Sequence, residues 1–287
     1  MSTFIDGLSL GSIYALIALG YTMVYGIAKM LNFAHGDIIM VGAYAILTTM
    51  ALCGQPLLAI VVSIVVCTVL GVLTEKLAYK PLRGASPLAV LITAIGVSYL
   101  LQSIAQLIYG AKSQPVKIYN FKSVSIGSFK MNTATIITLV VGTILMAALT
   151  LFIKKTKTGR AMLAVSEDRG AAQLMGINVN QIIMITFAIG SALAAFASTF
   201  YLMQIPSTSP TLGSMPGIKA FTAAVIGGIG SIPGAMIGGV LLGLIEKISL
   251  SIPVLAPYTT AFEFSLLIVI LLVKPTGIMG KQRREKV

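Results

Sequence analysis

The chain has 287 residues, of which 57% are hydrophobic and only 10% are charged, and its mean hydropathy is +0.97. Soluble domains carry about 25% charged residues, so this composition excludes an ordinary soluble protein and predicts a polytopic membrane protein. The formal net charge of +12 comes mostly from basic residues between apolar runs. That pattern is typical of loops that face anionic membrane lipid, not of a surface that binds nucleic acid.

Few residues are available for covalent or metal chemistry. The two cysteines, Cys53 and Cys67, lie in or beside apolar runs, so we expect no structural disulfide, no metal site and no cofactor. Met1–Asp6 has no basic segment and no small-residue cleavage site. We therefore expect the first apolar run to be a retained span rather than a signal peptide.

A short polar stretch separates the first two predicted spans. Gly7–Ala28 has about the twenty apolar residues that a bilayer crossing requires, and Ile38–Cys53 is the second span. Between them, Asn32, His35 and Asp37 interrupt the apolar run. An interfacial turn, with Asp37 capping the second span, explains all three residues and is the favoured interpretation. The alternative is that they line a translocation pathway, since polar groups at membrane depth are often functional.

Further apolar runs predict five more uninterrupted spans. They are Pro56–Thr74, Pro87–Tyr109, Thr133–Ile153, Ile182–Met203 and Tyr258–Val273. Residues 111–132 contain four lysines and no acid, and are rich in serine and β-branched residues. They predict an extracytoplasmic loop or a small hairpin between the fourth and fifth spans.

Residues 154–181, between the fifth and sixth spans, are too polar to cross a bilayer. Ser166 is predicted to cap a helix whose first turn holds Glu167 and Asp168, where carboxylates suit the positive end of the helix dipole. Gly176 lies where a helix commonly ends in the left-handed conformation. A short surface helix wedged between two spans indicates a docking element for a soluble partner.

Residues 217–250 are rich in glycine and predict a broken pair of helices. Gly227, Gly228 and Pro233 interrupt the apolar run near its middle, so we expect a short helix followed by a full one. Glycines four residues apart form two stripes that allow close helix packing. The stripes are Gly230, Gly234 and Gly238, and Gly239 and Gly243. Packing within the subunit is favoured over a seam between subunits.

The basic segments set the orientation. Lys76–Arg83, Lys154–Arg169 and Lys274–Lys286 can all face the cytoplasm if the N-terminus is outside and the chain crosses nine times. If the short helix before Pro233 re-enters instead, the count is eight and the basic tail would lie outside. We therefore predict an all-α membrane protein of eight to nine spans, forming a single domain over residues 1–287, with a cytoplasmic C-terminus.

No catalytic set is visible in the sequence, so we do not expect an enzyme. One histidine and eight dispersed acids offer no nucleophile paired with a base, and no phosphate-binding loop occurs. Glu246, Lys247 and Glu263 are assigned to the ends of spans, where interfacial placement accounts for them. Uphill transport would therefore need an external energy source, which suits the permease of an ABC importer with residues 154–181 as its docking segment. An ordinary amphipathic surface helix explains this segment equally well.

Three long motifs resemble those of the branched-chain amino acid ABC permeases of the LivH type. They are LNFAHGDIIMVGAY at 31–44, TKTGRAMLAVSEDRGAAQLMGINV at 156–179 and GIKAFTAAVIGGIGSIPGAMIGGVLLGLIE at 217–246. The likeness extends from about Gly7 to Gly280. It implies that residues 154–181 form the cytoplasmic loop that couples the permease to an ATPase. The coupling residues so implied are Gly159, Arg160, Glu167, Asp168, Arg169, Ala171, Ala172, Leu174, Met175 and Gly176.

The same resemblance implies an assembly in the bacterial plasma membrane. A LivM-type second permease would pair with this chain, and two cytoplasmic ATP-binding subunits would dock on the coupling helices. An extracytoplasmic solute-binding protein would deliver leucine, isoleucine or valine. The partners would hydrolyse ATP, and transport would proceed by alternating access.

Two other functions stay open at this point. A permease for urea or short amides would carry very similar motifs, because substrate is selected largely by the binding protein. A stand-alone channel or secondary carrier belongs to a different class and would transport without ATP.

Overall fold

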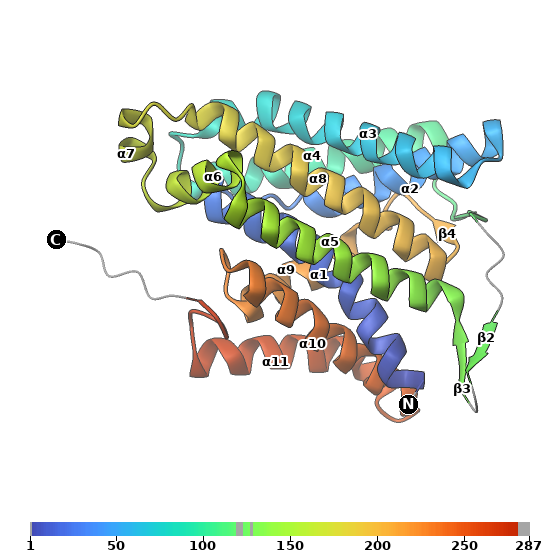
Figure 1. Cartoon of the computed structure of the whole chain (residues 1–287). Helices are drawn as coiled ribbons and strands as arrows, with labels where there is room; N and C mark the ends of the chain where they lie inside the picture. Colours follow the sequence, from blue (N-terminus) through green and yellow to red (C-terminus); the bar gives the residue numbers. More distant parts are fainter. Residues whose placement is uncertain (1, 119–122, 127–128, 281–287) are drawn as a thin grey trace.

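The structure, a computed structural model, describes residues 2–118, 123–126 and 129–280, and it is a bundle of helices packed side by side (Figure 1). The longer helices are α1 (Ser2–Ala28), α2 (His35–Cys53), α3 (Pro56–Thr74), α4 (Pro87–Tyr109), α5 (Thr133–Lys155), α8 (Val179–Gln204), α10 (Ile232–Ser251) and α11 (Thr259–Val273). Shorter helices are α6 (Lys157–Glu167), α7 (Arg169–Leu174) and α9 (Ser214–Gly227). Eight of the described helices are long and apolar enough to cross a membrane. The prediction of an all-α polytopic membrane protein is therefore confirmed.

Strands are few and short in the described residues. β2 (Ser123–Ile126) and β3 (Phe129–Asn132) form an antiparallel hairpin in which Ser123 lies opposite Asn132. β1 (Gln114–Pro115) pairs with β4 (Ser207–Thr208), so the segment after α4 is joined to the segment after α8. Within the loop predicted at 111–132, residues 123–126 and 129–132 are thus the strands of a hairpin beyond the end of the bundle (Figure 1).

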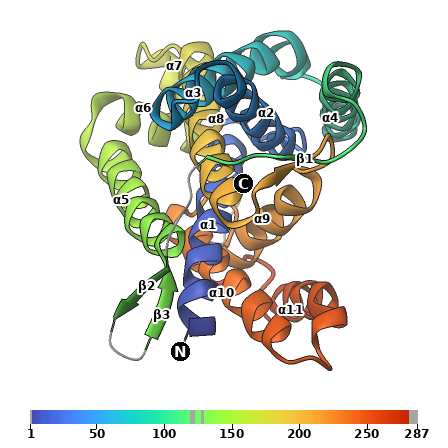
Figure 2. The same cartoon turned by 90° about the vertical axis from the view of Figure 1, so that its right-hand side faces the viewer.

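Helix α1 is the centre of the bundle. In the apolar window of α1, 89% of residues are buried within the chain, against 17% in α4 and 11% in α11. Ile13, Leu16 and Ile17 are fully buried, because α5, α8, α9 and α10 surround this helix. Viewed along the bundle, α4 and α11 stand apart on one side with α9 between them (Figure 2). These two helices leave most of their apolar surface to membrane lipid or to another subunit.

The two ends of the bundle are distinguished by their contacts. On the side of α7, the Arg169 guanidinium donates hydrogen bonds to the carbonyls of Ile27 and Ala28, at the end of α1. On the hairpin side, the Thr135 hydroxyl donates to a carboxylate oxygen of Asp6, at 3.2 Å, and joins the starts of α5 and α1. We call these ends the α7 side and the hairpin side.

The predicted segment Lys219–Ile248 forms two helices, and the first of them leads to the α7 side. α9 ends at Gly227, and Gly228 and Gly230 have φ of +103° and +93°, values that favour glycine. The Ser231 hydroxyl then accepts a hydrogen bond from Gly234 N–H and caps α10. A Cβ at Gly26, near the end of α1, would lie 3.3 Å from Gly230, which places this turn on the α7 side.

Residues 205–227 therefore make one full passage, although α9 alone has 14 residues and a helical crossing needs about 20. They start beside β1 on the hairpin side and end on the α7 side. Counted with the eight long helices, they bring the passages in the described chain to nine. The backbone N–H of Ile278 donates to the carbonyl of Ile226, so the segment after α11 also ends on the α7 side. The start of α1 lies at the opposite end (Figure 1).

The glycine stripes pack against neighbouring helices of the same chain. A Cβ at Gly239 would meet the backbone of Ala15, and one at Gly243 would meet the backbone of Gly11, so both face α1. Gly234 and Gly238 face α9 in the same way, while Gly230 lies in the turn before α10. The absence of side chains is what allows α10 to approach both α1 and α9 so closely.

Leucine in place of Gly239 is expected to force α10 away from α1. Overpacking of a dense core costs about 1–3 kcal/mol or more, so the midpoint of thermal unfolding in detergent should fall clearly. Gly96, on α4, gives a matched control because a Cβ there would meet nothing within 4 Å. Equal midpoints for Gly239→Leu and Gly96→Leu would contradict the close packing described here.

Candidate functional site

Helix α6 begins ten residues before the position expected from the sequence. The Thr156 hydroxyl accepts a hydrogen bond from Gly159 N–H at 3.0 Å and caps α6, while Ser166 lies in its last turn, where its hydroxyl donates to the carbonyl of Leu163. The prediction that Ser166 starts a helix is therefore wrong. A Cβ at Gly159 would meet the backbone of Ile153, so glycine lets α6 fold back against the end of α5.

Helix α7 is a separate, short element capped by Asp168. Asp168 has an extended backbone, with φ of −150°, and its Oδ1 accepts a hydrogen bond from Ala171 N–H at 3.0 Å. Gly176, with φ of +82°, follows the helix in the left-handed conformation. Leu174 and Met175 are 91% and 82% exposed, so the end of α7 presents two apolar side chains on the surface.

The other predicted coupling residues divide into exposed and inward-facing positions. Arg160, Glu167 and Ala171 are exposed, whereas Gly159 and Ala172 are buried. α7 lies beyond the ends of the long helices (Figure 1). From there Arg169 turns inward, and its guanidinium binds the last carbonyls of α1. Partial burial, with Arg83 nearby, lowers the pKa of Arg169. Arg169 therefore connects α7 to the central helix, a contact that no pattern in the sequence indicates.

The polar residues after α1 lie inside the bundle. Asn32, His35 and Asp37 are 2%, 1% and 2% exposed, so all three are packed inside the bundle rather than lying on its surface. α2 starts at His35, whose ring lies against Gly20 within α1 and Gly190 within α8. The chain after α1 turns back into the bundle before α2 begins, and this places the three side chains among the helices.

Each of the three side chains has a defined neighbour. The Tyr79 hydroxyl donates to Asn32 Oδ1 at 2.8 Å, and the rings of His35 and Tyr21 meet edge to face with centroids 4.8 Å apart. Asp37 does not cap α2, since the N-cap position is occupied by Ala34 and no side chain caps that end.

Asp37 instead lines a cavity of about 260 Å³ where the starts of α2 and α9 meet the middle of α4. Gln102 Nε2 donates to Asp37 Oδ1 at 2.9 Å, and lies 3.2 Å from Ser98 Oγ and 3.4 Å from Ser214 Oγ. The cavity is lined by Tyr21, Phe33, Gly36, Asp37, Ile95, Ser98, Tyr99, Gln102, Gly213, Ser214, Gly217 and Ile218. Tyr99 is 66% exposed, so the cavity opens outward on the α4 face of the bundle.

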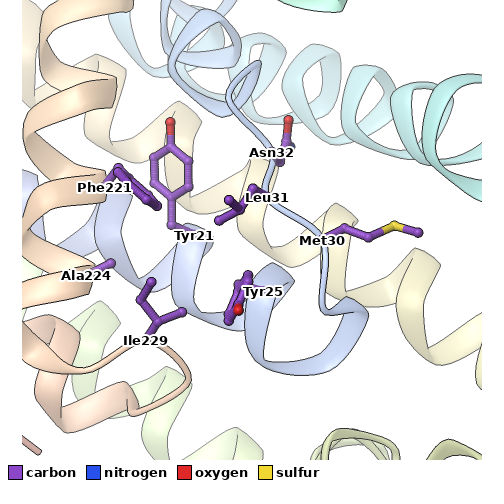
Figure 3. Close-up of a pocket in the computed structure, with 8 residues that line it drawn as sticks. All are labelled: Tyr21, Tyr25, Met30, Leu31, Asn32, Phe221, Ala224 and Ile229. Atoms are coloured by element: carbon purple, nitrogen blue, oxygen red, sulfur yellow. The ribbon is translucent and has the colours of Figure 1, made fainter. Parts of the chain in front are cut away.

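Aromatic side chains close this cavity towards the α7 side. The ring centroids of Tyr21 and Phe221 are 5.9 Å apart, and those of Phe33 and Phe221 are 5.3 Å apart. Beyond them is a much smaller pocket of about 10 Å³ that Tyr21 and Phe221 also line (Figure 3). Tyr25 and Ile229 line its far part, near the turn before α10. The rings of Tyr21, Phe33 and Phe221 thus lie between the larger cavity and the smaller pocket.

A buried charge cluster joins α9, α10 and α11 outside this cavity. Lys219 Nζ lies 2.9 Å from Glu246 Oε2 and 3.1 Å from Glu263 Oε1, and the Tyr14 hydroxyl donates to Glu246 at 2.7 Å. The Glu263 side chain is 1% exposed and that of Lys219 is 9% exposed. The assignment of Glu246 and Glu263 to the membrane interface is therefore wrong. Lys219 supplies the opposite charge that makes their burial tolerable, and sequence spacing does not reveal it because α9 and α11 are far apart in the chain.

Comparison with known proteins identifies the family. Residues 3–271 match the family described as "Branched-chain amino acid transport system / permease component". The chain is 44% identical to the high-affinity branched-chain amino acid transport system permease protein BraD of Pseudomonas aeruginosa, covering 100% of this chain and 98% of that one. It is 44% identical to the LivH permease of Escherichia coli K12, covering 98% and 96%, and 31% identical to a probable LivH of Methanocaldococcus jannaschii, covering 94% and 89%. The chain therefore belongs to the family of branched-chain amino acid transport permeases.

Proposed function

We propose that this chain is the membrane-spanning permease subunit of an ATP-driven importer of leucine, isoleucine and valine. The observation that carries this proposal is the 44% identity, over essentially the whole length of both chains, to proteins described as high-affinity branched-chain amino acid permeases. The nine passages of the chain and the cavity at membrane depth support the same function.

Besides this chain, the importer needs three kinds of subunit. A second permease of the LivM type covers the face between α4 and α11, which the chain itself leaves open (Figure 2). Two ATP-binding subunits bind at α7, and a solute-binding protein docks on the hairpin side. In this orientation the N-terminus is extracytoplasmic and the basic segments around Lys76–Arg83 and Lys154–Arg169 face the cytoplasm, in agreement with the positive-inside rule.

Coupling to the ATPase depends on the exposed end of α7. Leu174 and Met175 offer apolar side chains that a groove in a soluble partner can receive, as short helices in grooves do. Movement of α7 reaches the central helix α1 through the hydrogen bonds of Arg169 to the carbonyls of Ile27 and Ala28. Closure of the ATP-binding subunits would in this way alter the packing around α1 and switch access between the two sides.

The substrate passes through the cavity at the starts of α2 and α9, beside the second permease. The rings of Tyr21, Phe33 and Phe221 form the barrier towards the cytoplasmic side in the state that the structure represents. His35 packs against the Tyr21 ring, and Asn32, hydrogen-bonded to Tyr79, lines the smaller pocket beyond the rings. Asp37 faces the larger cavity.

Removing one ring of the barrier tests this pathway. In Phe221→Ala, Tyr21 and Phe33 both lose the Phe221 ring as a neighbour, and the larger cavity and the smaller pocket are expected to join. We expect leucine to leak down its gradient through the assembled permease without ATP, whereas the intact barrier permits almost none. Tyr258→Ala, at an exposed aromatic residue before α11, is the control. Equal passive leucine flux in Phe221→Ala and Tyr258→Ala would contradict the barrier.

The substrate class is tested with the assembled complex. Proteoliposomes containing both permeases and the ATP-binding subunits, supplied with the solute-binding protein, are expected to take up leucine, isoleucine and valine. Urea and acetamide should not be taken up above the level of empty liposomes. Uptake of urea or acetamide in place of the amino acids would overturn the proposed substrate.

A further inference from the structure

The cavity contains a buried carboxylate that has no cationic partner. Asp37 is 2% exposed, and its carboxylate accepts a hydrogen bond from the amide of Gln102, a neutral donor. The ion pairs among the described residues join Arg83 to Glu75 and Lys219 to Glu246 and Glu263, and none includes Asp37. The one histidine of the chain, His35, points instead towards Gly20 and Tyr21.

A carboxylate in such surroundings is costly unless a positive charge joins it. Burial disfavours an isolated ionised group, and buried charges in proteins are normally paired. The first turn of α2 offers Asp37 partial compensation from the helix dipole, and Gln102 offers one hydrogen bond. Neither supplies a countercharge. Ionisable residues of this kind within membrane segments usually mark the path of a substrate or an ion.

The remaining walls of the cavity suit a small apolar body. Tyr21, Phe33, Ile95 and Ile218 provide aromatic and aliphatic surface, and the described residues that line the cavity include no lysine or arginine. The volume of about 260 Å³ lies just under the usual range of small-molecule sites, about 300–1,000 Å³. Such walls favour a ligand with one positive group and a short hydrocarbon side chain. Urea and short amides are uncharged, so they have no cationic group that could pair with the carboxylate.

We propose that the Asp37 carboxylate receives the α-ammonium group of the amino acid in transit, while Tyr21, Phe33 and Ile218 contact its hydrocarbon side chain. Gln102 and the hydroxyls of Ser98 and Ser214 are positioning groups that hold the carboxylate towards the open side of the cavity. This inference rests on the proposed function. It adds that this permease, and not only its binding protein, recognises the ammonium group of the substrate.

The first test separates transport from ATP hydrolysis in the assembled complex. Asp37→Asn keeps the size and hydrogen-bonding capacity of the side chain but removes its charge. We expect the number of leucine molecules moved per ATP hydrolysed to fall at least tenfold, while ATP hydrolysis stimulated by the binding protein persists. Asp37→Glu, which keeps the charge, should retain a measurable fraction of the wild-type number of leucine molecules moved per ATP. Asp6→Asn, at the hairpin side, is a matched control and should keep the wild-type ratio.

A second test leaves Asp37 in place and therefore does not depend on how well Asp37→Asn folds. Ile218→Cys puts a thiol in the cavity, in a background where the exposed Cys53 is replaced by serine and Cys67 stays buried. Cationic methanethiosulfonate reagents are expected to react at least tenfold faster than anionic ones, and leucine should slow the reaction. Equal rates for the two reagents would overturn the proposal.

If the wild-type complex takes up urea and not leucine, the proposed function is wrong. If the wild-type complex takes up leucine and Asp37→Asn does so with an unchanged ratio of leucine to ATP, the function stands and the role of Asp37 is wrong.

Discussion

Replacing Lys219 by methionine is expected to prevent most of the permease from reaching its folded state. Methionine fills a similar volume, but it leaves Glu246 and Glu263 next to each other without the ammonium group that lies about 3 Å from both. Breaking a buried ion pair by removing one partner costs about 3–5 kcal/mol, a large part of the stability of a typical domain. We expect a strong loss of monodisperse protein in detergent, measured by fluorescence-detected size-exclusion chromatography.

The cost should depend on the buried carboxylates and not on the loss of a lysine as such. Lys247→Met, one position along α10 from Glu246, is the matched control, because no ion pair of Lys247 occurs among the described residues. Adding Glu263→Gln to Lys219→Met removes one unpaired charge and should restore part of the yield. A Lys219→Met protein as abundant and as monodisperse as Lys247→Met would show that the cluster carries little stability.

Placing two glutamates at the tip of α7, in the variant Leu174→Glu with Met175→Glu, is expected to abolish uptake while the protein stays folded. Both side chains are more than 80% exposed, so the change removes no buried contact. The Asp168 cap and the Arg169 hydrogen bonds to α1 remain in place. An apolar groove in the ATP-binding subunit would have to bury two charges, which is unfavourable. We expect leucine uptake to fall at least tenfold and the ATP-binding subunits to be lost on co-purification.

This variant is a sharper probe of docking than one at Asp168. Because Asp168 caps α7, its substitution would unfold the helix as well as change the surface. Leu77→Glu, at a 76% exposed leucine after α3, serves as the control and should retain uptake and partner binding. Full leucine uptake by the variant with both glutamates would show that α7 is not part of the docking surface.

The spans could be predicted from the sequence because the bilayer imposes their length. Runs such as Thr133–Ile153 correspond to α5 within two residues, since about twenty apolar residues are needed wherever a helix crosses. The division between α9 and α10 could also be predicted. Glycines that adopt a positive φ, followed by a proline at the start of α10, are typical of a break between two helices.

Depth in the membrane could not be predicted in the same way. Asn32 and Asp37 look like an interfacial turn, and only the return of the chain into the bundle before α2 places them inside. Glu263 looks interfacial because it is four residues from the start of α11, yet Lys219 of α9 lies beside it. In both cases a partner distant in sequence decides the position, and a single sequence contains no direct record of that contact.

The candidate site was visible in part. Ser98 and Gln102 are four residues apart within an apolar span, so they share one helix face, and that spacing could have marked the wall of a cavity. Tyr21 and Phe221 gave no such signal, since aromatic residues in apolar helices are usually core. The α7 segment stood out by its polarity, but its division into two helices depends on Asp168 adopting an extended backbone.

We expect this permease to move amino acids only when partner subunits hydrolyse ATP, and uptake into proteoliposomes measures this dependence. The complete complex, with binding protein and leucine on the hairpin side and ATP on the α7 side, is expected to accumulate leucine above the external concentration. A non-hydrolysable ATP analogue should reduce uptake to the level of empty liposomes, and so should omission of the ATP-binding subunits. Leucine uptake by this chain alone, without ATP, would contradict the claim.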